Sequence, residues 1–479
     1  MDGRGGAIGR SRWPRAGTAA DGVFDAVVVG SGPGGATAAL ELTRLGWRVL
    51  ILEMGRNTPV TGGMAQTLRE LWMPGRSLFL TDGLLAVLRG VTVGGSSIYF
   101  WGTAWEPPYG LFAKHGIDIR GEVEEVKRYL PTAPLPQDLM GPAARRLMEC
   151  ANDLGYAWRP LPKFYDQARL GGPPMGSYGA PSYEAKWNAR MFVDEAVALG
   201  ATLLTGAAVR RVLVEDGVAT GVEFVRRGET RTVRAPEIVV AAGGIGSPRI
   251  LRASGVDGAG RSFFCDPLVA VAGTLPGVGR GLELPMVGGA VVEEEGYMLT
   301  DMSVPRWVYS LITTQVGRLD RLAAYRDVAT IMVKIRDDVQ GRLGRSGGIR
   351  KRLTPVDRGK LSRGTERARA ILRRAGAKGI FRTLPFAAHP GGAVPIGRLV
   401  DSDLATEIRG LHVCDASVIP DPWGLPPTLT LIGLAMRLAR HLAASTARPF
   451  DEAARLAAPL RAEPAPQARF SATSRRGAE

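Results

Sequence analysis

The chain has 479 residues, of which 45% are hydrophobic and 22% are charged. This balance excludes a disordered protein, a disulfide-stabilised miniprotein and a coiled coil, and the length suits two or more domains. The net charge is +15, and residues 341–382 concentrate it, because they carry fourteen Lys and Arg against Asp357 and Glu366.

The basic segment 341–382 is of a kind that attracts nucleic acid, anionic membrane surfaces or acidic redox partners. No DNA- or RNA-binding motif accompanies it, so we expect no nucleic-acid partner. We favour a solvated, arginine-rich helix face, and keep a peripheral contact with an anionic surface as the alternative.

The three cysteines, Cys150, Cys265 and Cys414, lie far apart with no CxxC pair. This spacing supports neither a disulfide framework nor a thiolate zinc site, and we expect no metal. The first 22 residues lack the apolar stretch of a secretory signal, and no apolar run reaches the ~18–20 residues that cross a bilayer. We therefore expect a soluble, cytoplasmic protein.

The first half of the chain begins with a βαβ pattern. After a disordered tail at 1–22, the predicted elements are a buried strand at 24–30, a helix at 36–46 and a second buried strand at 48–53. Such a unit implies a parallel sheet. Residues 106–185 are proline-rich and irregular, with one helix expected at 141–154, and they predict an excursion into another layer.

Regular elements return from residue 190. The expected order is a helix at 190–200, strands at 201–206 and 209–228 with a hairpin turn at Glu215–Gly217, a buried strand ending in glycine at 237–244, a buried strand in 410–417 and a helix at 428–442. Residues 264–385 alternate between strand-like and helical stretches, which suits a second domain. The tail at 447–479 is expected to be disordered.

A glycine turn joins the first strand to its helix. Gly30, Gly32 and Gly35 form a GxGxxG, and Glu53 ends the next strand. The glycines permit a tight turn and close approach to a pyrophosphate, and the acid can accept hydrogen bonds from ribose hydroxyls. With no basic residue beside Glu53 the pattern leaves NAD or FAD. Glycine-rich chain returns at 94–97, 243–246 and 415–427, which suits a long ligand and favours FAD.

Four stretches resemble the glucose-methanol-choline (GMC) family of flavoenzymes. They are the glycine turn with its βαβ unit, VTVGGSSIYFWG at 91–102, AAGGIGSPRILRASGV at 241–256, and HPGG at 389–392 followed by GLHVCDASVIPDPWGLPPTLTLIG. The resemblance implies an α/β fold with a Rossmann-like FAD-binding domain and an interleaved α+β substrate domain with a mostly antiparallel sheet. The implied FAD-binding domain comprises 23–105, 186–262 and 396–446, and the substrate domain 106–185 and 263–395.

The resemblance also implies noncovalent FAD and a set of cofactor contacts. Position by position, these are Gly30, Ser31, Gly32, Gly34, Gly35, Glu53, Gly94, Gly95, Ser96, Val209, Ala242, Gly243, Asp415, Ala416, Pro427, Thr428 and Leu429. Asp415 closes a buried strand, where its carboxylate suits a ribityl hydroxyl, although it could instead cap the next turn.

His389 is the expected catalytic base. It lies in the small-residue string LPFAAHPGG and matches the family's catalytic histidine, whereas His412 and His441 suit structural roles. A neutral imidazole can remove a hydroxyl proton while the α-hydrogen leaves as hydride to flavin N5. The family's second histidine or asparagine is missing, because Pro426 aligns at that position, and Phe100 replaces a usual asparagine.

Aromatic residues near the presumed flavin suggest a bulky, fairly apolar alcohol as substrate. The expected pocket residues are Tyr99, Trp101, Trp423 and Pro426. The leading hypothesis is an FAD-dependent alcohol dehydrogenase or oxidase acting on CH–OH groups. The alternatives are a flavin dehydrogenase or isomerase acting on a C–C bond, and a non-catalytic electron-transfer module. The electron acceptor stays open between oxygen, a quinone and a redox protein.

Overall fold

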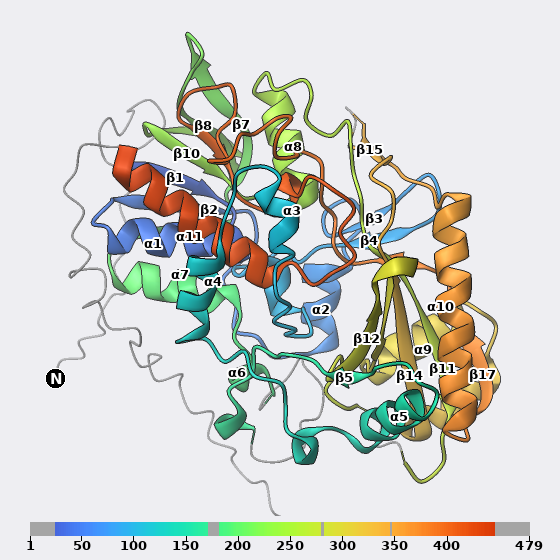
Figure 1. Ribbon diagram of the computed structural model, residues 1–479. Helices are drawn as coiled ribbons and strands as arrows, with labels where there is room; N and C mark the ends of the chain where they lie inside the picture. Colours follow the sequence, from blue (N-terminus) through green and yellow to red (C-terminus); the bar gives the residue numbers. More distant parts are fainter. Residues whose placement is uncertain (1–23, 171–181, 279–281, 345–346, 446–479) are drawn as a thin grey trace, which may run out of the picture.

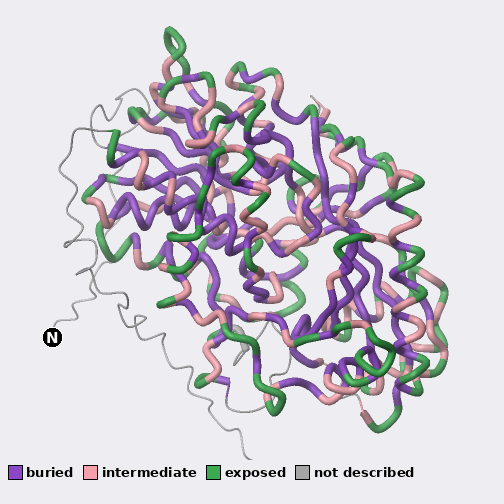
Figure 2. The backbone as a smooth tube through the Cα atoms, viewed as in Figure 1, coloured by how far each residue is buried: buried purple, intermediate pink, exposed green. Residues whose placement is uncertain are grey.

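A computed structural model describes residues 24–170, 182–278, 282–344 and 347–445 (Figure 1). The two tails expected to be disordered, 1–22 and 447–479, lie outside the described residues. Two sheets with separate cores form the body of the molecule, and buried chain concentrates within each (Figure 2).

The first sheet has five parallel strands in the order β19-β10-β1-β2-β6. Their bounds are Ala26–Val29 for β1, Val49–Glu53 for β2, Thr202–Thr205 for β6, Glu237–Val240 for β10 and Leu411–Val413 for β19. The central strands are buried apolar runs, as expected for strands covered on both faces. The predicted βαβ unit is confirmed.

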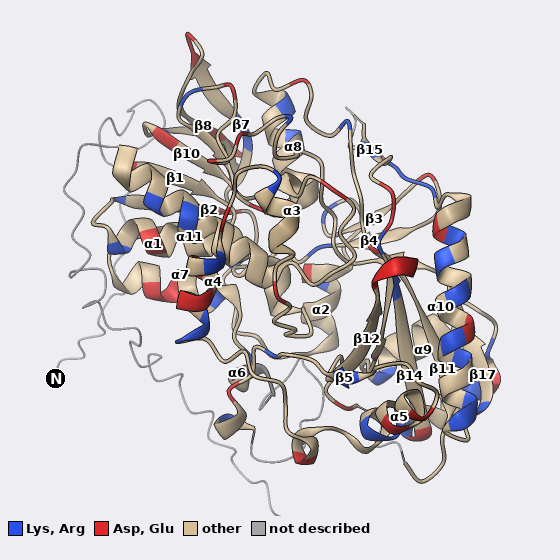
Figure 3. Ribbon diagram, viewed as in Figure 1, with Lys and Arg blue, Asp and Glu red and all other residues tan. Residues whose placement is uncertain are grey.

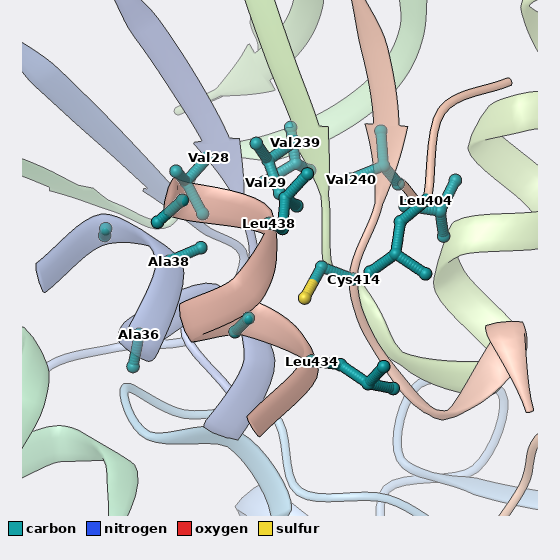
Figure 4. Close-up of a cluster of buried hydrophobic side chains, with 14 of the residues drawn as sticks. Val28, Val29, Ala36, Ala38, Val239, Val240, Leu404, Cys414, Leu434 and Leu438 are labelled. Atoms are coloured by element: carbon teal, nitrogen blue, oxygen red, sulfur yellow. The ribbon is translucent and has the colours of Figure 1, made fainter. Parts of the chain in front are cut away.

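Helices α1 (Pro33–Arg44), α7 (Ala189–Ala198) and α11 (Thr428–Ser445) pack together beside this sheet, and α4 (Arg120–Lys127) packs on α11. Figure 4 shows the apolar cluster between α1, α11 and the strands, including Cys414 at the end of β19. Gly34 permits this packing, because a Cβ there would lie 2.0 Å from the carbonyl oxygen of Cys414. Only glycine fits that contact.

The other side of the first sheet carries a hairpin layer and a helix. The predicted hairpin is present as β7 (Ala208–Glu215) and β8 (Val218–Arg226), and β9 (Glu229–Arg234) completes a three-stranded antiparallel sheet. Helix α8 (Gly243–Ala253) follows β10 directly and packs on β7. Its start therefore lies at the carboxyl edge of the parallel sheet, beside the start of α1.

The second sheet has nine strands, ordered β3-β4-β18-β11-β14-β13-β12-β5 with β17 also on β11. Their bounds are Leu78–Leu80 for β3, Ala86–Leu88 for β4, Arg159–Pro160 for β5, Pro267–Thr274 for β11, Gly288–Val292 for β12, Tyr297–Asp301 for β13, Val328–Ile335 for β14, Lys378–Arg382 for β17 and Phe386–Ala387 for β18. The pairing is antiparallel except between β4 and β18. This mixed α/β architecture confirms the expected fold class.

The two faces of the second sheet differ in what covers them. On one face α5 (Pro142–Asp153) and α10 (Pro355–Arg374) bury Ile331, Val333 and Ile335 of β14. The alternate residues Met332 and Lys334 face the opposite way, because strand side chains alternate, and line the large cavity described below. The remaining elements are α2 (Met64–Leu71), α3 (Tyr109–Ala113), α6 (Ser182–Ala185), α9 (Arg306–Thr314), β15 (Arg342–Leu343), β16 (Ile349–Arg350) and the 3₁₀ helices η1 (Gly95–Ile98), η2 (Gln137–Leu139), η3 (Gln167–Arg169), η4 (Glu293–Glu295), η5 (Leu319–Asp327) and η6 (Ala416–Val418).

Two segments lie differently from the implied domain ranges. Strands β3 and β4 fall within 23–105 but pair into the second sheet, and α3 and α4 fall within 106–185 but pack into the core of the first. Both departures depend on contacts between residues far apart in sequence. The rest of the domain division stays a prediction.

About half of the basic segment 341–382 forms helix α10, which packs on the second sheet and carries several blue Lys and Arg positions along its ribbon in Figure 3. Several of its arginines are paired: Arg363 and Arg367 with Glu295, and Arg374 with Asp153. Cys150, Cys265 and Cys414 are unpaired and buried. None of the helices in the described ranges combines the length and hydropathy needed to span a bilayer.

Candidate functional site

The turn between β1 and α1 opens the start of α1 to a large cavity. Gly30 has φ +102° and a Cβ there would lie 2.3 Å from the carbonyl oxygen of Ala241, so the turn requires glycine. Gly32 is the N-cap of α1, with no side-chain cap and no atom within 4 Å of its Cβ direction. The free amides and the helix dipole at this point suit an anion such as a pyrophosphate.

Glu53 lies beside the glycine turn and fixes it. Its Oε2 accepts hydrogen bonds from the amide (3.1 Å) and hydroxyl (2.6 Å) of Ser31, and its Oε1 accepts one from the Gly55 amide at 2.6 Å. Burial raises the pKa of Glu53, while these donors oppose the rise. The Ser31 hydroxyl also accepts a hydrogen bond from Gly94 (3.1 Å), which places the predicted 94–96 segment against the turn.

Asp415 joins the end of β19 to the start of α8. Its Oδ2 accepts hydrogen bonds from the Gly243 amide at 2.8 Å and from the Ser247 hydroxyl, and its Oδ1 accepts one from Ser417 at 2.8 Å. It therefore caps the following 3₁₀ turn and also borders the cavity. Its contact with a ribityl hydroxyl stays a prediction. Burial raises the pKa of Asp415.

One cavity of about 710 Å³ runs from the glycine turn to His389. Most of the predicted cofactor residues line it: Gly30, Ser31, Gly32, Gly34, Glu53, Gly95, Ser96, Val209, Ala242, Gly243, Asp415, Ala416, Pro427 and Thr428. The predicted pocket residues Tyr99, Trp101 and Pro426 line it as well. A glycine cradle, an acid at the second strand and a continuous elongated cavity together fit FAD.

Four predicted site residues do not line the cavity. Trp423 is wrong as a pocket residue, because it packs in the first core, with its ring centroid 6.2 Å from that of Phe112. Leu429 is likewise fully buried in that core. Gly35 packs on the carbonyl oxygen of Gly30, and Gly94 supports the turn through Ser31. These two glycines therefore support the glycine turn without lining the cavity.

His389 forms the polar centre at the other end of the cavity. Its Nδ1 lies 3.0 Å from Oδ2 of Asp266 and 3.4 Å from Nζ of Lys334. The side chain is 25% exposed, whereas those of Asp266 and Lys334 are 0% and 1% exposed. Oδ1 of Asp266 accepts a hydrogen bond from the Gly424 amide at 2.8 Å, which fixes this carboxylate.

Burial and a neighbouring cation both favour the neutral form of His389. Burial and the adjacent Lys334 cation lower its pKa, and the contact with Asp266 only partly opposes this. Burial lowers the pKa of Lys334 to about 8, so its amine is mainly protonated at neutral pH. An Asp266 carboxylate accepting from Nδ1–H leaves Nε2 as the acceptor nitrogen. The arrangement can therefore remove a proton from a ligand in the cavity.

Sequence reasoning missed Asp266 and Lys334. Asp266 has φ +50°, unusual for a residue other than glycine, but this is visible only in the structure. A lysine inside the apolar run VATIMVKI of β14 was a detectable signal, because an interior cation needs a partner or a function. Lys334 brings to the cavity a polar donor that Pro426 does not supply.

The part of the cavity near His389 is apolar. Its walls include Leu268 and Met332 from strands of the second sheet, Met286 and Met302 from the chain next to β12 and β13, and Val308 and Ile312 from α9. Tyr99, in contrast, donates its hydroxyl to Oε2 of Glu70 at 2.8 Å and presents mainly its ring. Such flexible, unbranched and aliphatic side chains suit a large apolar ligand.

The comparisons with known proteins agree with this geometry. Two family models described as GMC oxidoreductase match residues 24–287 and 304–435. An uncharacterised GMC-type oxidoreductase of Mycobacterium tuberculosis is 27% identical, covering 87% of this chain and 75% of the relative. A long-chain-alcohol oxidase of Arabidopsis thaliana is 24% identical, covering 88% and 68%. The crystal structure of pyridoxine 4-oxidase has a TM-score of 0.67 at 19% identity, covering 87% and 99%.

Proposed function

Because the chain belongs to the GMC oxidoreductase family and binds FAD, we propose that it oxidises the CH–OH group of a bulky, apolar alcohol with His389 as base. The observation that carries this proposal is the His389–Asp266 pair at the apolar end of a cavity that begins at the glycine turn. The long-chain-alcohol oxidase among its relatives supports the substrate class.

The residues of the chain divide the work as follows. FAD, when bound, is the hydride acceptor. The carboxylate of Asp266 accepts the Nδ1 hydrogen of His389 and so holds Nε2 ready for the hydroxyl proton of the alcohol. Burial and the Lys334 cation both lower the pKa of His389 and so favour the neutral imidazole before the reaction. A positioned base of this kind contributes ~10²–10⁴-fold in rate.

The apolar wall accounts for the proposed substrate. Methionine and leucine side chains offer no hydrogen-bond partners to a polyol, so a sugar there would leave hydroxyls unpaired. An alkyl chain instead gains about 0.8 kcal/mol for each methylene that it buries. We therefore expect kcat/KM to rise with the chain length of the alcohol.

Anaerobic reduction of the bound flavin tests this function. The purified protein is mixed with primary alcohols of increasing chain length, and bleaching of the visible flavin band is followed. We expect bleaching that is faster with longer chains and slower with α-deuterated alcohol. Bleaching only by substrates that lack a hydroxyl would instead favour chemistry on a C–C bond.

A further inference from the structure

Three leucines that line the cavity are also exposed to solvent. Leu80, Leu84 and Leu384 are 62%, 75% and 55% exposed, and each lines the cavity that contains His389. Among the large hydrophobic side chains exposed in the described part of the chain, no others line it. These three residues, the leucine rim, therefore mark the mouth of the cavity.

The leucine rim is one surface because its strands are paired. Strands β4 and β18 run parallel with Ala86 opposite Phe386, so Leu84 and Leu384, each two residues earlier, lie at the same end of the pair. Leu80 of β3 lies opposite Ala86 on the other side. Figure 1 shows β3 and β4 together at the edge of the second sheet.

Further apolar side chains extend the surface around α2 and α9. Met73, just after α2, is 44% exposed, and Leu311 on α9 is 37% exposed. The rings of Trp72 and Trp307 meet at 6.0 Å and connect the end of α2 to the start of α9. Both helices also contribute side chains to the cavity wall. Apolar exposure concentrated at one place marks an interaction site more often than scattered residues do.

Exposed arginines of the basic segment 341–382 flank the leucine rim. The loop between β3 and β4 is held against residues 349–352, because the Asp82 amide donates to the carbonyl of Ile349 and the Lys351 amide donates to Asp82. This brings the exposed Arg350 and Arg352 beside the rim, where Arg352 is paired with Asp82 at 3.1 Å and Arg350 makes no such pair among the described residues. Arg382, also exposed, is two residues before Leu384. Cations thus border an apolar mouth.

We propose that the leucine rim and its flanking arginines dock on an anionic phospholipid bilayer, so that an apolar alcohol passes from the lipid directly into the cavity. The passage of substrate rests on the proposed function, whereas the docking itself does not. Leucines entering the acyl boundary and arginines contacting lipid phosphates supply the two signals that reversible membrane binding needs.

A bilayer fits this surface better than a second copy of the chain. In a symmetric dimer formed through the leucine rim, Arg350, Arg352 and Arg382 of both copies would meet at one interface. Their like charges would repel each other there. Such a dimer would also cover the mouth of the cavity. The anionic headgroups of a bilayer would instead neutralise these arginines. The acyl chains beneath the headgroups would then be in contact with the mouth of the cavity.

Vesicle sedimentation with the flavin-loaded protein tests the proposal. One set of vesicles contains phosphatidylcholine and phosphatidylglycerol in equal amounts, and the other contains phosphatidylcholine alone. We expect binding to the mixed vesicles that weakens with added salt. The rim variant L80S/L84S/L384S should bind about tenfold or more weakly. For the variant R350Q/R352Q/R382Q, the affinity for mixed vesicles should fall about fivefold for each arginine replaced. Its affinity for neutral vesicles should change much less.

A matched control is the triple variant L154S/L199S/V214S. These residues are 40%, 36% and 37% exposed and lie away from the cavity, so this variant should bind vesicles as the parent protein does. The flavin spectrum and thermal unfolding check that every variant is folded.

Two outcomes would overturn the docking proposal. One is failure of the parent protein to bind either kind of vesicle, including the case in which sedimentation velocity shows a dimer that the rim variant dissociates. The other is equal loss of vesicle binding in the rim and control variants. Because vesicle binding is measured without substrate, it remains informative even if no alcohol bleaches the flavin.

Discussion

Asp266 holds His389 through Nδ1, with Oδ2 of the carboxylate 3.0 Å from that nitrogen. The shorter contact favours the tautomer with hydrogen on Nδ1, because a carboxylate can only accept. Lys334, whose Nζ lies 3.4 Å from the same nitrogen, then acts on the imidazole through its charge and not as a donor to Nδ1. Nε2 is then the basic nitrogen. The proposed role of His389 as base therefore depends on a residue 123 positions earlier in the chain, immediately before β11.

Replacing Asp266 with asparagine should disable the base without removing it. The amide can still accept from Gly424, but its NH₂ group would donate to Nδ1 and favour the opposite tautomer. We expect the rate of flavin reduction to fall about 10²-fold or more, with FAD still bound. The matched control is Glu237→Gln, which alters a second carboxylate–histidine pair, with His412. Equal rate losses in both variants would contradict the assignment.

Replacing Lys334 with methionine should shift the pH profile of flavin reduction. Activity falls at low pH because the imidazole must be neutral to accept a proton. Burial and the Lys334 cation lower the pKa of His389, so removing the cation raises it. The acid limb of the profile should therefore move to higher pH, while Lys378→Met, an exposed change on β17, should leave it in place. An acid limb that stays or moves to lower pH would show that Lys334 does not act on His389.

Replacing Gly34 with alanine should destabilise the FAD-binding core. The new methyl group would meet the carbonyl oxygen of Cys414, so α1 and the end of β19 must move apart. We expect a loss of about 1–3 kcal/mol in the free energy of unfolding and weaker retention of FAD. Gly121→Ala, in α4 with no atom within 4 Å, should be neutral or stabilising. Thermal unfolding of both variants measures the difference, and equal melting temperatures would rule out the close contact.

The local parts of the fold could be predicted from sequence. The βαβ unit around Gly30 and Glu53, the hairpin at Glu215–Gly217 and helix α11 each combine a clear hydrophobic period with its turn residues. The glycine turn also predicted a dinucleotide ligand, because the same few residues form both the turn and the anion site.

The rest depended on contacts between distant segments. The sequence around Trp423 does not indicate that its ring packs against Phe112 in the first core. Asp266 and Lys334 meet His389 only because β11, β14 and the chain after β18 converge in one sheet. The short strands β3 and β4 carry too few residues to reveal which sheet they join. Local pattern contains no information on such pairings.

The most direct test of the account compares two histidines. His389→Asn and His412→Asn are each loaded with FAD and mixed anaerobically with a long-chain primary alcohol, and the rate of flavin bleaching is measured. We predict a loss of about 10²–10⁴-fold for His389→Asn, with FAD content unchanged, and a rate near that of the parent for His412→Asn. A His389→Asn variant that bleaches as fast as the parent protein would contradict the assignment of His389 as the base.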